Sequence, residues 1–327
     1  AHLDRRGLPA EALSPRKGLS AAALERVRDA LAPDGRVLRV RPLHGGISSS
    51  VHVVRLQTAR GERQAVVVRR YGDYAQRTDP PVSIREFRLL EMLAQHSYPA
   101  PRPLLVDANG GAFGAPTVVM TRLPGRPLLA PRNVQDYVRQ MARTLADLHR
   151  LPIGGLEFLP DQRDLNRRTF ANRPVADDPL QHAVFDAAVA AWPAVLQSSA
   201  TRVLLHGDYW PGNLLWSRQR LVGVIDWEQP RLGPPDLDVA TCRGDLTILF
   251  GPGAAADFVD EYERVSGTRL RHGRFWDLLI STWAVREIAD WATVYPVLGR
   301  PELTPEMARQ RIRGFAEAAL ARGDDSS

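Results

Sequence analysis

Cysteine and lysine are almost absent from this sequence, which has one of each among 327 residues. Since Cys242 has no second cysteine to pair with, an internal disulfide and a cysteine metal cluster are excluded. Its place after Val239 and Ala240 on a predicted helix favours a small buried side chain. Because Lys17 is the only lysine, any role for a lysine elsewhere in the chain must fall to arginine or be absent.

Long apolar runs and basic runs are also absent. No stretch approaches the about 18 consecutive apolar residues of a membrane helix, and the segment from Ala1 to Arg6 contains no apolar signal core. We therefore expect a cytoplasmic protein without a membrane span. The net charge is +6, but the arginines are scattered among acidic residues and no zinc-finger or RNP-type motif is present, which argues against a nucleic acid partner.

The apolar pattern predicts strands first and helices later. The length allows about two domains or lobes, and 44% hydrophobic and 24% charged residues are typical of a globular protein. After a lead-in and one helix, strands are predicted at residues 36–43, 51–58, 64–70, 104–107 and 116–123. Further helices are predicted at residues 83–95, 134–149, 183–195, 237–250, 255–266, 274–294 and 305–322. Residues 151–179 show no clear period, and no catalytic residue is expected there.

The stretch from His206 to Asn213, with Asp226 thirteen residues further on, holds three oxygen-bearing side chains. Apolar runs precede Asp208 and Asp226, so each acid is predicted at the end of a short strand. Phosphoryl transfer requires a carboxylate near the acceptor hydroxyl and oxygen ligands for Mg²⁺. The spacing Asp-x₄-Asn is that of the protein-kinase catalytic loop. Each residue alone is most often a turn or cap residue, but the joint pattern favours phosphoryl transfer.

This pattern resembles the signature His-Gly-Asp-x₄-Asn, followed by an apolar strand and Ile-Asp, of the aminoglycoside phosphotransferases and their relatives, which include choline, homoserine and macrolide kinases. The resemblance implies Asp208 as the catalytic base and His206 as a structural support of the loop. It also implies Asn213 and Asp226 as the ligands of Mg²⁺.

The same resemblance implies an α+β, two-lobed protein-kinase-like fold. A small N-terminal lobe with an antiparallel sheet, which binds the nucleotide, is expected over residues 1–122, of which 1–35 are the lead-in and helix. A larger, mainly helical C-terminal lobe, which carries the catalytic and acceptor-binding residues, is expected over residues 123–327.

A Gly/Ser run between the first two strands offers phosphate contacts through Gly45, Gly46, Ser48 and Ser49. Glycine lets a backbone approach a ligand and serine donates hydrogen bonds, although most such runs are plain hairpins. By resemblance this run is the nucleotide loop. The resemblance also places Met120 and Arg122 in the hinge, whose backbone meets the adenine.

Arg69 closes the third strand where the resemblance calls for the lysine that holds the α and β phosphates. A guanidinium can hold phosphate with two hydrogen bonds. Arg70, on the other face of the strand, is one alternative. The other is that Arg69 is a solvated arginine without a function. In the family an early glutamate of the next helix pairs with this cation; Glu86 fits by position, and Glu91 is also present.

Asp238 follows a run that resembles the family's Gly-Asp-Pro-x-x-Asp-Leu-Ala, with Pro234 in place of the first Asp. The resemblance implies that Asp238 hydrogen-bonds the catalytic loop, and a plain N-cap is the alternative. A late helix interleaves tryptophans with three acids, namely Asp277, Glu287 and Asp290. Such helices wall the acceptor site in the family, where acids suit a polyamine, but a tryptophan-rich helix with solvated acids is more often core.

The predicted activity is transfer of the γ-phosphoryl of ATP or GTP, with Mg²⁺, to a hydroxyl of a small molecule, in a monomer or homodimer. The expected acceptor is an aminoglycoside or another hydroxylated antibiotic, with a role in antibiotic resistance. Three alternatives stay open: a metabolic kinase for choline, homoserine or another amino alcohol, a protein kinase, and an inactive nucleotide-binding module. The missing arginine of His-Arg-Asp argues against a protein kinase, and the intact Asp208, Asn213 and Asp226 argue against an inactive module.

Overall fold

The computed structural model describes residues 18–43, 49–174, 178–197 and 201–323. Contacts between residues divide the chain into two compact units. The N-terminal unit extends to Pro124 and also contains Gly223–Glu228, whereas the C-terminal unit contains Gly125–Val222 and Gln229–Ser327. The short segment around Asp226 therefore belongs to the N-terminal unit, although it lies late in the chain.

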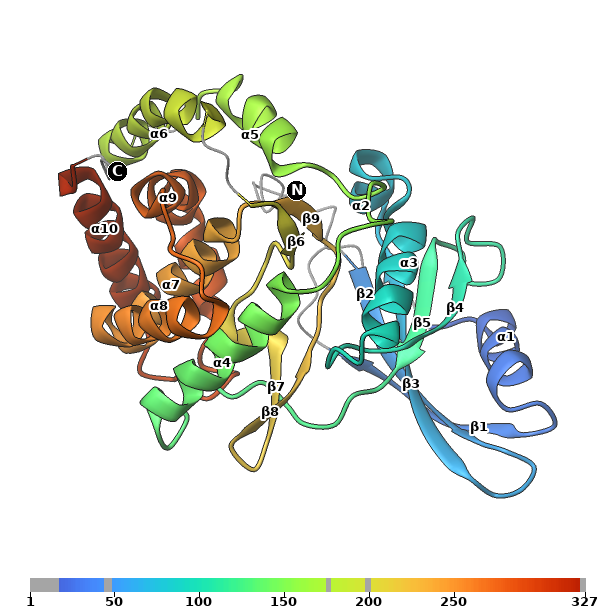
Figure 1. Ribbon diagram of the computed structural model, residues 1–327. Helices are drawn as coiled ribbons and strands as arrows, with labels where there is room; N and C mark the ends of the chain where they lie inside the picture. The colour runs from blue at the N-terminus through green and yellow to red at the C-terminus, as the bar shows by residue number, and fades with distance from the viewer. Residues whose placement is uncertain (1–17, 44–48, 175–177, 198–200, 324–327) are drawn as a thin grey trace. The chain divides into compact units, whose positions relative to one another are not determined.

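The N-terminal unit is built on a five-stranded antiparallel sheet with the order β1-β2-β3-β5-β4 (Figure 1). Its strands are β1 (Arg36–Leu43), β2 (Ser49–Gln57), β3 (Arg63–Tyr71), β4 (Pro103–Asp107) and β5 (Thr117–Thr121). Valine-rich runs in β2 and β3 suit a pleated surface, because branched side chains pack well there. The predicted strands and their antiparallel arrangement are confirmed.

Helices cover this sheet, and the two faces of β3 have different neighbours. Val66 and Val68 of β3 pack in one apolar cluster with residues of α1 (Ala21–Leu31). The odd-numbered residues of β3 point to the opposite face, since side chains alternate along a strand. Helix α3 (Val82–Gln95) packs against β4 and β5. A short helix, α2 (Asp73–Thr78), follows β3 and was not predicted.

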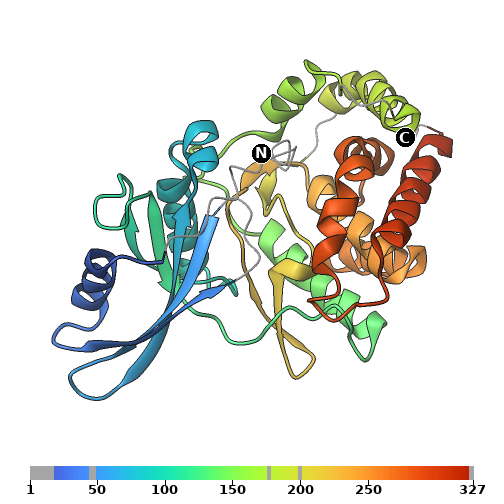
Figure 2. The same ribbon diagram turned by 180° about the vertical axis from the view of Figure 1, so that it is seen from behind.

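The C-terminal unit is mainly helical, as predicted. Its helices are α4 (Val134–His149), α5 (Gln162–Phe170), α6 (Pro179–Gln197), α7 (Asp236–Phe250), α8 (Pro252–Ser266), α9 (Gly273–Trp291) and α10 (Pro305–Ala321), with 3₁₀ turns η3 (Pro211–Asn213) and η4 (Ala292–Val294). Helix α9 packs against both α6 and α10 (Figures 1 and 2), and Trp276 and Trp283 of α9 are buried in the core there. The alternative that this tryptophan-rich helix is part of the core is confirmed for these two tryptophans.

Helix ends in the C-terminal unit follow local chemistry that the sequence shows. Asn133 accepts a hydrogen bond from the N–H of Asp136 at the start of α4, and Thr304 caps α10 in the same way. Gly267 ends α8 with a φ of +72°, a left-handed conformation that favours glycine. Helix α5 is the main departure, because it lies in the segment 151–179 where little regular structure is predicted.

Short strands flank the segment from His206 to Asp226. Strand β6 (Val203–Leu205) pairs antiparallel with β9 (Arg231–Gly233), and β7 (Leu214–Ser217) lies beside β8 (Arg220–Val224). His206 follows directly after β6, and Asp226 comes soon after β8, as predicted. In the part of the chain that the structure describes, no helix has the length and apolarity needed to cross a membrane.

Candidate active site

The loop that begins at His206 is fixed by a buried carboxylate. Asp238, in the first turn of α7, is fully buried. Its two oxygens accept hydrogen bonds from the N–H of His206 at 2.7 Å and from the N–H of Gly207 at 2.8 Å. The predicted bond between Asp238 and the loop is confirmed, and the N-cap alternative is wrong because Pro235 occupies the cap position.

Asp238 is itself held by two helices that the sequence did not connect to it. Nε2 of His149 at the end of α4 lies 3.3 Å from the carboxylate, and Nδ1 of His149 lies 2.8 Å from the hydroxyl of Tyr262 on α8. A carboxylate only accepts, so Nε2 of His149 donates to Asp238. Burial alone raises the pKa of Asp238, but His149, His206 and the N–H of Gly207 lower it below the ordinary value. Asp238 therefore anchors the loop as an anion.

Gly207 cannot be replaced without moving the loop. Its φ is +82°, and a Cβ at this position would lie 2.2 Å from the carbonyl oxygen of Gln229. Its own carbonyl oxygen accepts a hydrogen bond from Arg231 of β9 at 3.4 Å. Both the conformation and the close approach require glycine here.

Asp208 and Asn213 are brought together by this loop. Asn213, at the end of η3, donates through Nδ2 to the backbone oxygen of Asp208 at 2.9 Å and to its Oδ2 at 3.2 Å. The N–H of Asp208 donates to Nδ1 of the fully buried His206 at 3.2 Å, which agrees with the predicted supporting role of that histidine. Since the amide nitrogen of Asn213 faces Asp208, its Oδ1 points away, and this oxygen accepts no hydrogen bond from the described residues. It is therefore available to a cation.

In the N-terminal unit, Arg69 lies among three carboxylates. Its Nη1 is 3.0 Å from Oε1 of Glu86, 3.1 Å from Oδ1 of Asp226 and 3.4 Å from Oε1 of Glu228. The second oxygen of Glu86 accepts a hydrogen bond from the hydroxyl of Tyr71. The predicted pair of Arg69 with Glu86 is confirmed. Glu228, which joins Asp226 at the same guanidinium, was not predicted.

One arginine and three carboxylates lie together here, and this excess of negative charge shifts the pKa values of Arg69 and Glu86. Burial alone lowers the pKa of Arg69, but the three carboxylates raise it above the ordinary value, so the guanidinium stays charged. The pKa of Glu86 is raised to about 7: burial raises it most, the charge of Arg69 opposes this, and the charges of Glu228 and Asp226 add to the increase. Nε of Arg69 is buried and has no hydrogen-bond partner among the described residues. Arg69 therefore has a donor left for an anionic ligand.

Arg70 occupies the other face of β3. Its Nε donates to Oγ of Ser50 at 3.1 Å, and its Nη1 lies 3.5 Å from the carbonyl oxygen of Phe113. These contacts confirm the prediction that Arg69, and not Arg70, lies beside Glu86. The role of Arg69 toward nucleotide phosphates stays a prediction.

Asp226 has the backbone and exposure of a ligand-binding residue. Its φ of +72° lies in a region that residues other than glycine rarely adopt and that is enriched at functional sites. Its side chain is 38% exposed, against 13% for Glu228 and 2% for Glu86. Asp226 is thus the carboxylate of the group that is most open to a ligand.

The oxygens of Asn213 and Asp226 suit Mg²⁺. Within the described ranges, no three His, Cys, Asp or Glu side chains form a group that would hold a metal ion. Mg²⁺ usually keeps several waters and takes one or two protein oxygens together with nucleotide phosphates. Asn213 in the C-terminal unit and Asp226 in the N-terminal unit each offer one side-chain oxygen of the kind that this ion takes.

Six further predicted nucleotide contacts remain predictions, and three of these residues lie outside the part of the chain that the structure describes. Gly45, Gly46 and Ser48 lie outside the described residues. Ser49 starts β2, and its Oγ donates to Oε1 of Glu228 at 2.8 Å. Met120 is buried in β5. The N–H of Arg122, just after β5, lies 3.4 Å from the carbonyl oxygen of Ala65, so that N–H is engaged within the unit.

Two acids of α9 are buried and form ion pairs with arginines. Asp277 is fully buried and forms ion pairs with Arg243 and Arg322. Glu287 is buried and pairs with Arg286. The alternative of a solvated acidic face is therefore wrong for these two residues, and a role toward a polyamine acceptor stays a prediction. Cys242 is also fully buried, and burial raises the pKa of its thiol well above the ordinary value, as expected of a packing residue.

Comparison with known sequences agrees with this geometry. Residues 39–276 match the profile of the family described as phosphotransferase enzyme family. The chain belongs to this family. The protein-kinase-like fold and the resemblance to this family are confirmed.

The curated relatives of the phosphotransferase divide into two kinds. It is 28% identical over 180 residues to a protein named probable acyl-CoA dehydrogenase IBR3 from Arabidopsis thaliana, a match that covers 48% of this chain and 22% of the relative. The chain spans less than a quarter of the length of that relative. It is 26% identical to a homoserine kinase from Beijerinckia indica over 287 residues, which are 80% of this chain and 83% of the relative.

Solved structures show the same fold. A mutant of aminoglycoside phosphotransferase APH(4)-Ia, in complex with AMP-PNP and hygromycin B, has a TM-score of 0.62 at 15% identity and covers 94% of this chain and 100% of its own. Choline kinase LicA from Streptococcus pneumoniae has a TM-score of 0.57 at 19% identity, with coverage of 91% and 96%. At these identities the likeness is one of fold, so the acceptor has to be inferred from residues of this chain.

Proposed function

We propose that this phosphotransferase moves the γ-phosphoryl of ATP, or of GTP, to a hydroxyl of a small molecule with the help of Mg²⁺. The observation that carries the proposal is the contact of Asp208 with Asn213 on a loop fixed by Asp238. Asp208 would orient the acceptor hydroxyl and accept its proton. Asn213 and Asp226 would hold Mg²⁺, which neutralises charge on the transferred phosphoryl group when it is bound.

The nucleotide would be held by the N-terminal unit. Arg69 combines a fixed position beside Glu86 with an Nε donor that has no partner among the described residues. An anionic phosphate satisfies such a donor with a charge-assisted hydrogen bond. The structural neighbour in complex with AMP-PNP, an ATP analogue, supports ATP as the donor.

Two classes of acceptor have different support. An aminoglycoside or another hydroxylated antibiotic, with a role in resistance, follows the named function of one structural neighbour. A metabolic acceptor is the second candidate, because the match to homoserine kinase covers most of both chains. In either case we propose a cytoplasmic monomer or homodimer that acts without nucleic acid or membrane.

The test is a screen of nucleotide consumption with Mg²⁺ across aminoglycosides, macrolides, amino alcohols and hydroxylated acids, followed by Asp208→Asn with the best acceptor. Loss of the base should lower turnover by about 10²-fold or more. Asp147→Asn is the control, because Asp147 is an exposed acid on α4 in a surface ion pair. Turnover of Asp208→Asn within a few-fold of Asp147→Asn, with the fold intact, would remove Asp208 from this role.

A further inference from the structure

We propose that Arg85 is a positioning residue for the metal site, because it holds the backbone that carries Asp226. This inference rests on the proposed function, in which Asp226 is a ligand of Mg²⁺. Arg85 lies on α3, directly before Glu86, and its Nη2 donates to the carbonyl oxygen of Glu228 at 3.2 Å. Helix α3 and the segment Gly223–Glu228 both belong to the N-terminal unit, so this bond lies inside one compact part of the chain.

The backbone at Asp226 needs support from its surroundings. Its φ of +72° is rare for a residue other than glycine, and such a conformation persists only where neighbouring contacts fix it. Two residues before Asp226, the N–H of Val224 donates to the carbonyl oxygen of Pro99 at 2.7 Å. Two residues after it, the carbonyl oxygen of Glu228 accepts the bond from Arg85. Asp226 therefore lies between two points at which the main chain is held, and Arg85 supplies the second.

Arg85 holds this segment without using the oxygens that a metal takes. Nη1 of Arg69 lies 3.1 Å from Oδ1 of Asp226, and Oγ of Ser49 donates to Oε1 of Glu228 at 2.8 Å. Both contacts engage carboxylate oxygens, which are also the ligands that Mg²⁺ prefers. The bond from Arg85 instead ends on a main-chain oxygen, so it can persist when Mg²⁺ binds. Arg85 can therefore fix Asp226 both with and without the metal.

A carboxylate fixes the direction of the Arg85 guanidinium. Nη1 and Nη2 of Arg85 donate to the two oxygens of Asp79, which lies at the end of α2. Nη2 also donates to Glu228, and a guanidinium carries enough N–H groups for all three bonds in one planar fork. Lysine has one nitrogen on a flexible stem, so it cannot reproduce this fork. The geometry therefore requires arginine at this position.

Stability alone does not account for Arg85. Its side chain is 8% exposed, and its Nε is buried without a hydrogen-bond partner in the part of the chain that the structure describes. A buried charge with an unused donor costs folding free energy, and apolar side chains that fill the same space are often as stable or more stable. The bond to the backbone of Glu228 gives this costly side chain a function.

Loss of Arg85 should lower the affinity for Mg²⁺ and not the affinity for the nucleotide itself. A ligand that is already in place loses little conformational freedom when it binds a metal. Removal of a partner that orients a metal ligand typically costs about 10- to 100-fold in metal affinity. Arg69, by contrast, is proposed to meet the phosphates directly. The effects of the two arginines should therefore differ, because Arg69 acts on ATP with or without Mg²⁺ and Arg85 acts only through Asp226.

The first experiment measures hydrogen exchange of the full chain without nucleotide or metal. Arg85→Gln removes the charged donor to Glu228, and the amides of Gly223–Glu228 should exchange about 10-fold faster or more, as expected for the loss of one charge-assisted hydrogen bond. Arg88→Gln is the matched control, because Arg88 is an exposed arginine on the same helix, and it should leave this exchange as it is in the original chain. Equal exchange in the two variants overturns the proposal. An equal increase throughout the N-terminal unit would mean a structural role only and also overturns it.

The second experiment measures the Kd of ATP by calorimetry with and without Mg²⁺. Arg85→Gln should lose about 10- to 100-fold of the tightening that Mg²⁺ gives, while its Kd for ATP without the metal stays close to that of the original chain. Arg85→Lys, which keeps a charge beside Asp79, should recover part of the tightening. Equal losses with and without Mg²⁺ would show a structural role and overturn the proposal. If Arg85→Gln does not fold, Arg85→Lys decides in both experiments, because tightening and exchange equal to those of the original chain would also overturn it.

Failure of this inference differs from failure of the proposed function. If Mg²⁺ tightens ATP binding in the original chain and in Arg85→Gln alike, but not in Asp226→Ala, the metal role of Asp226 is confirmed and the role of Arg85 is wrong. If Mg²⁺ has no effect on ATP binding in the original chain, the proposed function is wrong in its metal, and the exchange rates alone decide whether Arg85 holds the segment.

Discussion

Glu86 should make the stability of the N-terminal unit fall as the pH rises. Its folded pKa is about 7, above the ordinary value of 4.5, chiefly because the carboxyl is buried. Between these two values the folded chain binds more protons than the unfolded chain, so the free energy of unfolding decreases with increasing pH. At about 1.4 kcal/mol per pKa unit, the shift corresponds to roughly 3 kcal/mol between pH 4 and pH 8.

The test is Glu86→Gln, which keeps an oxygen for Arg69 and a group of the same shape beside Tyr71, whose hydroxyl can turn to accept. The free energy of unfolding is measured in urea from pH 4 to pH 8. The difference between Glu86→Gln and the original chain should shift in favour of the variant by roughly 3 kcal/mol across this range. Glu91→Gln, an exposed position on the same helix, should show no such shift. A difference that stays constant with pH would refute the assigned ionisation of Glu86.

Three more predictions concern the loop and the ligands. Arg69→Ala should weaken the binding of ATP by about 1.5–3 kcal/mol and leave the binding of adenosine nearly unaffected, whereas Arg70→Ala should change neither. If calorimetry shows the loss of ATP binding for Arg70→Ala instead, Arg70 is the residue that holds the phosphates. Asp226→Ala should abolish the tightening of nucleotide binding by Mg²⁺, and an unchanged metal dependence would exclude this ligand. Gly207→Ala should abolish turnover because its Cβ would meet a carbonyl oxygen at 2.2 Å, whereas Gly154→Ala, with open space around it, should be as active as the original chain in the same assay.

The sequence predicts contacts best where two residues belong to one motif. Asp208 with Asn213 could be placed because the family signature states both residue type and spacing. Arg69 with Glu86 could be placed because the resemblance pairs the cation at the end of this strand with an early glutamate of the next helix. The contact of Ser49 with Glu228 could not be placed, because the two lie 179 positions apart and no motif states their spacing. His149 likewise lies at the end of a predicted helix and outside any motif, although it holds the anchor of the loop.

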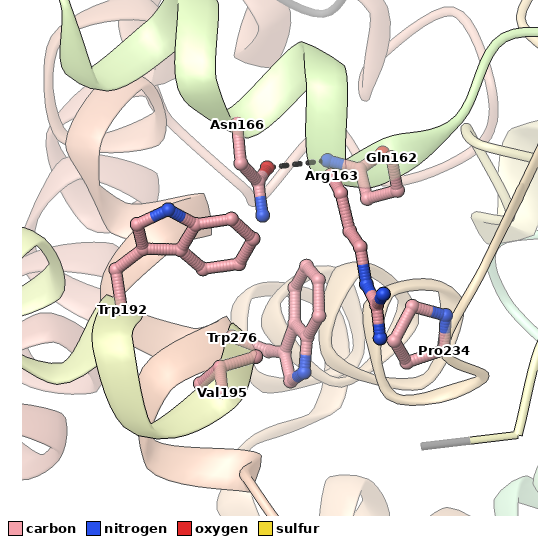
Figure 3. A pocket seen from close by; sticks show the side chains of 7 residues that line it. All are labelled: Gln162, Arg163, Asn166, Trp192, Val195, Pro234 and Trp276. Atoms are coloured by element: carbon pink, nitrogen blue, oxygen red, sulfur yellow. Dashed lines mark hydrogen bonds between the residues drawn. The ribbon is translucent and has the colours of Figure 1, made fainter. Parts of the chain in front are cut away.

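Helix α5 shows a second limit of sequence reasoning. Hydrophobic periodicity detects a helix by its apolar face, but the buried face of α5 consists of Gln162, Asn166 and Thr169. Each of these polar side chains has a hydrogen-bond partner inside the unit, as Figure 3 shows for Gln162 and Asn166, and this makes its burial possible. Apolar patterning cannot detect a helix whose buried face is polar in this way.

The anchor at Asp238 also bears on how the chain acquires activity after unfolding. Asp238 joins the loop at His206 to His149 and, through it, to Tyr262, contacts that are 32, 89 and 113 positions apart in sequence. Contacts between distant positions form late in folding, because long loops must close first. Helices α4, α7 and α8 can each form before these three contacts exist, but the loop has no fixed shape until all three helices have docked. In a refolding experiment, circular dichroism should therefore regain its native value before enzymatic turnover does.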